Sequence, residues 1–83
     1  MSVQYALKVN LPGGGFAFGA IDEGGAWRLA AMREWPDVAL YARPSQARRA
    51  AHGLLDALGD VDRVDIARFQ DSLGRPFETV VRI

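Results

Sequence analysis

The chain has 83 residues, which is enough for a single domain spanning residues 1–83 and too few for a second. Ten Lys and Arg balance ten Asp and Glu, so the zero net charge argues against a bulk polyanion binder and against an acidic mimic of DNA. The absence of cysteine excludes disulfides, thiolate metal sites and cysteine nucleophiles.

The composition also indicates where the protein is found. The hydrophobic fraction of 49% and the charged fraction of 24% are typical of a soluble domain. The first residues lack the features of a signal peptide, and no apolar run approaches the roughly 18 to 20 residues of a membrane helix. We therefore expect a cytoplasmic protein (host cytoplasm if phage-encoded) with no membrane contact.

The first half of the chain predicts an antiparallel meander. Apolar and polar residues alternate in runs that are separated by glycine with proline or aspartate. The predicted strands are residues 3–11, 16–21 and 26–32, with a short edge strand at 38–41. The third run also fits helical spacing, so residues 26–35 stay open between strand and helix. We favour the strand because Gly24 and Gly25 suit a hairpin.

One helix is predicted over residues 45–58, with Ser45 as its N-cap and Gly59 as a left-handed residue after its end. Its buried stripe has i, i+3, i+4 spacing. The members of this stripe are Ala47, Ala50, Ala51, Leu54 and Leu58.

A terminal hairpin is predicted after the helix, with strands at residues 61–70 and 77–83. The first of these strands points Val64 and Ile66 inwards. The second carries Phe77, Thr79, Val81 and Ile83 on one face. The predicted fold class is therefore α+β: an antiparallel sheet of four to five strands with one helix packed on one face. The predicted order is strand-strand-strand-(strand)-helix-strand-strand.

Residues 14–21 partly match the consensus of the RNA recognition motif. Gly15, Phe16, Ala17 and Phe18 match it, whereas its basic, aliphatic and final aromatic positions are not matched. In that motif the segment follows a strand, a helix and a second strand, for which the preceding residues leave no room. A glycine-rich turn that enters a core strand is therefore the better interpretation.

No set of residues predicts catalysis or a metal site. His52 shares a predicted helix face with Arg48 and Asp56, which offers at most two metal ligands, one fewer than a usual catalytic zinc site. The aspartates at positions 56, 60, 62 and 65 lack the spacing and the terminal Glu of an EF-hand loop. We therefore expect a protein that is not an enzyme, with no catalytic residue, metal or cofactor.

Tryptophan and arginine are the residue types most enriched in interface hot spots. We assign Trp27 to the core, whereas Trp35, next to Pro36, is harder to bury. Solvated arginines and core packing of Trp35 remain the alternative interpretation. The predicted protein-binding residues are Arg28, Arg33, Trp35, Arg43, Arg48, Arg49 and Arg75.

The predicted elements are, in chain order, a strand meander, a loop with tryptophan, one Ala-rich helix and a terminal hairpin. This overall plan resembles that of the compact anti-CRISPR proteins of phages and mobile elements. The resemblance is one of size and plan, so no functional residue is transferred from it. It implies an inhibitor that docks on a bacterial CRISPR effector complex and blocks recruitment of target DNA. The alternative is a small nucleic-acid-binding protein that uses the arginines and exposed aromatic residues.

A single helix cannot cover both faces of such a sheet, so one face must meet solvent or another chain. Two registers are open for the second strand, which turn Phe16 and Phe18 either towards the helix or away from it. We favour the inward register, which predicts a monomer or weak homodimer. The outward register would expose an aromatic patch that calls for a partner.

Overall fold

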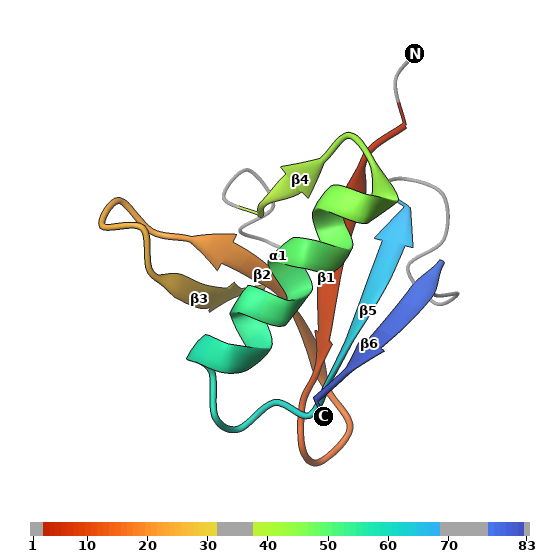
Figure 1. Ribbon diagram of the computed structural model, residues 1–83. Helices are drawn as coiled ribbons and strands as arrows, with labels where there is room; N and C mark the ends of the chain where they lie inside the picture. Colours follow the sequence, from red (N-terminus) through yellow and green to blue (C-terminus); the bar gives the residue numbers. More distant parts are fainter. Residues whose placement is uncertain (1–2, 32–37, 69–76, 83) are drawn as a thin grey trace.

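The computed structural model describes residues 3–31, 38–68 and 77–82. In this part, six strands form one antiparallel sheet and one helix packs across it, which confirms the predicted α+β class (Figure 1). The elements are β1 (Tyr5–Asn10), β2 (Phe16–Ile21), β3 (Trp27–Ala30), β4 (Leu40–Tyr41), α1 (Pro44–Ala57), β5 (Arg63–Arg68) and β6 (Glu78–Val81).

The sheet order is β3-β2-β1-β5-β6, so the predicted meander and the predicted terminal pair are both present. The turn between β2 and β3 explains why residues 27–30 extend as a strand. The Oδ1 atom of Asp22 accepts hydrogen bonds of 2.9 Å from the backbone N–H groups of Gly24 and Ala26. Gly25 supplies the positive φ of 85° that this tight turn requires.

Strand β4 fills the place where β1 and β2 part. The start of β1 pairs with β4, whereas the rest of β1 pairs with β2 from Lys8 onward. Val38, just before β4, pairs with Ala20 of β2, and the Ala39 N–H donates to the Gly19 carbonyl at 3.1 Å. The chain that leads into the helix is therefore fixed to both strands, and this positions α1 over the sheet.

Helix α1 is confirmed, but both of its predicted caps are wrong. The N-cap is Arg43 without a side-chain cap, and Pro44 opens the first turn, so Ser45 already lies inside the helix. The C-cap is Leu58 in an extended conformation, and Gly59 does not adopt a positive φ. The Arg82 side chain instead donates to the Leu58 carbonyl at 2.6 Å, so the end of the helix is satisfied from the C-terminal strand.

The main core lies between α1 and the sheet. Ala47, Ala51 and Leu54 are buried as predicted, whereas Leu55 replaces Ala50 and Leu58, which are half-buried. The helix therefore rests on a slightly different stripe from the predicted one. The strands contribute Leu7, Val9, Val64, Ile66 and Val80 to this core, and Val61, just before β5, completes it.

The preferred register of β2 is wrong, because Phe16 and Phe18 lie on the face of the sheet away from the helix. Phe18 is fully buried in a second, smaller core with Ala6, Ala20, Ala30 and Val38. Gly19 takes the position under the helix, where an added Cβ would lie 2.7 Å from Leu54 Cδ1. Only a residue without a side chain fits there, and alternation then turns both phenylalanines to the other face.

On β6, Val80 is the buried residue. The face that was predicted to carry Phe77 and Val81 together is exposed, since Phe77 is 49% and Val81 is 53% exposed. Phe77 packs instead on the Tyr5 ring, with ring centroids 5.3 Å apart.

Candidate functional site

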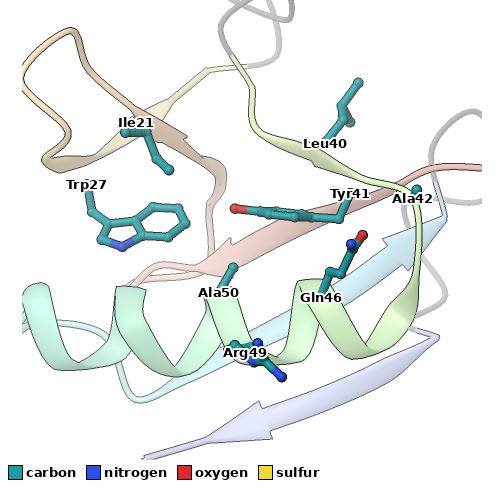
Figure 2. A pocket seen from close by; sticks show the side chains of 8 residues that line it. All are labelled: Ile21, Trp27, Leu40, Tyr41, Ala42, Gln46, Arg49 and Ala50. Atoms are coloured by element: carbon teal, nitrogen blue, oxygen red, sulfur yellow. The ribbon is translucent and has the colours of Figure 1, made fainter.

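An open groove lies between α1 and the part of the sheet formed by β2, β3 and β4 (Figure 2). Its volume is about 500 Å³, which falls in the size range of ligand sites. We call it the aromatic groove. Its lining residues are Ile21, Trp27, Leu40, Tyr41 and Ala42 from the sheet side and Gln46, Arg49 and Ala50 from the helix.

Trp27 forms one wall of the aromatic groove. It begins β3 and pairs with Ile21 at the end of β2. Its ring packs close to two glycines: an added Cβ would lie 3.3 Å from Trp27 Cζ3 at Gly19 and 3.5 Å from Trp27 Nε1 at Gly53. The indole is therefore held between sheet and helix. The prediction that Trp27 belongs to the core holds for one side of this half-buried ring, which packs against the core residues. The other side of the ring faces the groove.

Tyr41 lies across the groove from a different element. It pairs with Tyr5 through β4, and Figure 2 shows its hydroxyl pointing toward the end of the groove that holds Ile21 and Trp27. The ring is half-buried, and this burial raises the pKa of Tyr41 above the ordinary value of 10.0. None of the described residues forms a hydrogen bond with this hydroxyl, so it is available to a ligand.

The helix supplies the polar side of the groove. Gln46 and Arg49 are three residues apart on α1, so they lie on one side of the helix. Both side chains are exposed, and Arg49 is the single charged residue among the described lining residues. Arg49 makes no ion pair within the described part of the chain. The groove thus combines aromatic walls with an uncompensated positive charge.

The predicted binding arginines are distributed over several surfaces. Arg48 forms a bidentate pair with Glu78 of β6, at 2.6 Å and 2.8 Å. This pairing lowers the pKa of the Glu78 carboxyl and ties the helix to the edge strand. Arg43 is exposed immediately before α1, and Arg28 is half-buried and lies on the face of β3 opposite to Trp27.

Three of the predicted binding residues lie outside the described residues: Arg33, Trp35 and Arg75. Of the predicted set, the structure therefore places Arg49 in the groove. Sequence reasoning missed Tyr41 and Gln46 as site residues. One signal in the sequence could have indicated them. Gln46 and Arg49 have i, i+3 spacing outside the buried stripe of the helix, and they follow shortly after the aromatic residue Tyr41.

The other candidate sites have simpler explanations. His52 is exposed, and the described residues include no group of three or more His, Asp or Glu that could hold a metal ion. Asp65 is buried, where it accepts hydrogen bonds from Asn10 at 3.0 Å and Thr79 at 2.8 Å. It thereby joins the side chains of β1, β5 and β6 and acts as a structural residue.

The two phenylalanines considered for nucleic-acid stacking differ in exposure. Phe16 is 44% exposed, and Lys8 Nζ lies 4.5 Å from its ring centroid. Phe18 is fully buried and offers no surface to a base. Strand β2 therefore presents one exposed phenylalanine, where a stacking platform built from these two residues would need both rings exposed.

Comparison with known proteins leaves the function to be argued from this geometry. No protein-family model, curated protein or solved structure matches the chain. Within the described ranges, no helix has both the length and the apolar character needed to cross a membrane.

Proposed function

We propose that this protein is a non-enzymatic protein-binding module whose contact surface is the aromatic groove. One observation carries the proposal: Trp27, Tyr41 and Arg49 come together around a single open groove. Trp, Tyr and Arg are the three residue types most enriched among interface hot spots. Each is partly accessible and is held by a different element of the fold.

The surroundings of the groove favour a protein partner. Ile21, at its rim, is 48% exposed and extends the apolar surface beyond the groove. An apolar centre with a polar edge is the usual anatomy of a protein–protein interface. A nucleic acid would instead require a cluster of cations, and the described lining contains only Arg49.

We further propose that the partner is a bacterial CRISPR effector complex and that binding blocks recruitment of target DNA. The support for this is the resemblance in size and plan to compact anti-CRISPR proteins. The zero net charge favours recognition of a specific patch over mimicry of DNA. Co-elution with purified effector complexes, followed by a target-DNA binding assay, tests this partner separately from the groove.

The groove itself is tested by site-specific photo-crosslinking in the source cells. One variant carries the photoreactive residue at Gln46, inside the groove. The matched control carries it at Val81, which is 53% exposed on β6 and does not line the groove. We expect a discrete protein crosslinked from position 46 and not from position 81. The same crosslinks from both positions, or none from position 46, would overturn the proposal.

A further inference from the structure

Two neighbouring arginines of α1 differ in whether they form an ion pair. Arg48 is neutralised by Glu78 through two hydrogen bonds. The next residue, Arg49, faces the aromatic groove and has no ion-pair partner among the described residues. The described lining also contains no Asp or Glu. An anionic group entering the groove would therefore meet one unpaired cation and, among the described lining residues, no repelling charge.

Hydrogen-bond donors lie next to apolar surface within the groove. The Tyr41 hydroxyl, the Gln46 amide and the Arg49 guanidinium can all donate, and they come from β4 and α1. In Figure 2 the side chains of Ile21 and Trp27 lie at one end of the groove and that of Gln46 at the other, with the Tyr41 ring between them. The groove is therefore suited to a ligand in which an apolar group lies next to a hydrogen-bond acceptor.

We infer that the occupant of the groove is a partner segment in which a large apolar side chain stands next to a carboxylate. This inference rests on the proposed protein-binding function. The apolar side chain would pack against Trp27 and Ile21, while the carboxylate would accept hydrogen bonds from Arg49 and Gln46. A guanidinium and a carboxylate form the paired, charge-assisted bonds that give this kind of recognition its geometry. Recognition of phosphorylated segments generally uses several arginines, whereas the described lining contributes one.

Selection of random peptides displayed on phage tests the inference and does not require the partner to be identified. The wild-type protein is compared with Arg49→Glu and with Val81→Glu, a control that adds a negative charge outside the groove at a residue that is 53% exposed on β6. We expect wild-type selections to be enriched in Asp or Glu within two positions of an aromatic or aliphatic residue. Arg49→Glu should remove the acidic preference, and Val81→Glu should retain it.

The affinities of the selected peptides give the quantitative result. Arg49→Glu should weaken binding by about tenfold or more, the fold-change expected for loss of a charge-assisted hydrogen bond. Groove dependence is checked with Ile21→Glu, which changes an exposed residue at the rim and should abolish binding. Unfolding curves confirm that each variant is folded.

The outcomes separate this inference from the proposed function. Peptides that require Ile21 but show no acidic preference, or that bind Arg49→Glu as well as wild type, would overturn the inference and leave the groove as a protein-binding site. If no selected peptide depends on Ile21, both the inference and the proposed function fail.

Discussion

Gly19→Ala changes the position at which sheet, helix and groove meet. An added methyl group would lie 2.7 Å from Leu54 Cδ1 and 3.3 Å from both Leu7 Cβ and Trp27 Cζ3. Leu54 and Leu7 are fully buried, so neither side chain can move into open space. Overpacking of this kind costs about 1–3 kcal/mol, whereas the higher strand propensity of alanine returns about 0.5–1 kcal/mol. The two contributions together give a net loss of about 0–2.5 kcal/mol in the free energy of unfolding, and we expect a value near the middle of this range, about 1 kcal/mol.

Urea denaturation followed by circular dichroism and tryptophan fluorescence measures this loss. For a domain of this size, the melting temperature should fall by about 4–8 °C for each kcal/mol. Gly59→Ala is the matched control, because no atom lies within 4 Å of its added Cβ and its φ is not positive. We expect the control to match the wild type or to be stabilised by up to about 1 kcal/mol. Equal stability of the two variants would refute the close packing of helix on sheet at Gly19.

Four further substitutions test other parts of the structure. Phe18→Ala should lose about 3–5 kcal/mol of unfolding free energy in urea because Phe18 is fully buried, whereas Phe16→Ala at a 44% exposed site should lose less than about 1 kcal/mol. Pairing with Arg48 lowers the pKa of Glu78 below its ordinary 4.5, so its stabilising contribution is complete above that value and is lost as the pH falls through the lowered pKa. Melting curves of Glu78→Gln should therefore show a weaker acid dependence than those of the wild type, and identical acid limbs would refute the pairing. Burial raises the pKa of Tyr41 above 10.0, so the wild type should lose stability as the pH rises through this raised value. Melting curves recorded below and above pH 10.0 should show a smaller loss of stability for Tyr41→Phe than for the wild type.

The elements of the fold could be predicted because their signals are local. Alternation defined β1 and β2, and the turn before Trp27 favoured the strand that the structure contains. The facing of β2 could not be predicted in this way, since both of its faces are buried at its centre and alternation has the same period for either choice. The contact between Gly19 and Leu54, which are far apart in the sequence, determines which face of β2 lies under the helix.

The candidate site was predictable only in part, for the same physical reason. Arginine is recognisable as an interface residue from its chemistry, but its partner is not. Arg48 and Arg49 are adjacent, yet the packing of α1 against β6 gives one a carboxylate and leaves the other at the groove. A short strand at residues 38–41 was predicted and contains β4. Tyr41 became a site residue because β4 pairs with the start of β1, and a pairing between segments so far apart in the sequence cannot be predicted from local alternation.

The role of the groove is tested most directly by comparing two charge insertions in their affinity for the partner captured from position 46. Ile21 at the rim of the groove is 48% exposed, and Val81 on β6 is 53% exposed, so glutamate is tolerated equally well at either site. The dissociation constants are measured by isothermal titration calorimetry. We expect Ile21→Glu to weaken binding by about tenfold or more, equivalent to about 1.4 kcal/mol, and Val81→Glu to leave it unchanged. Equal affinities for the two variants would contradict the assignment of the aromatic groove as the binding site.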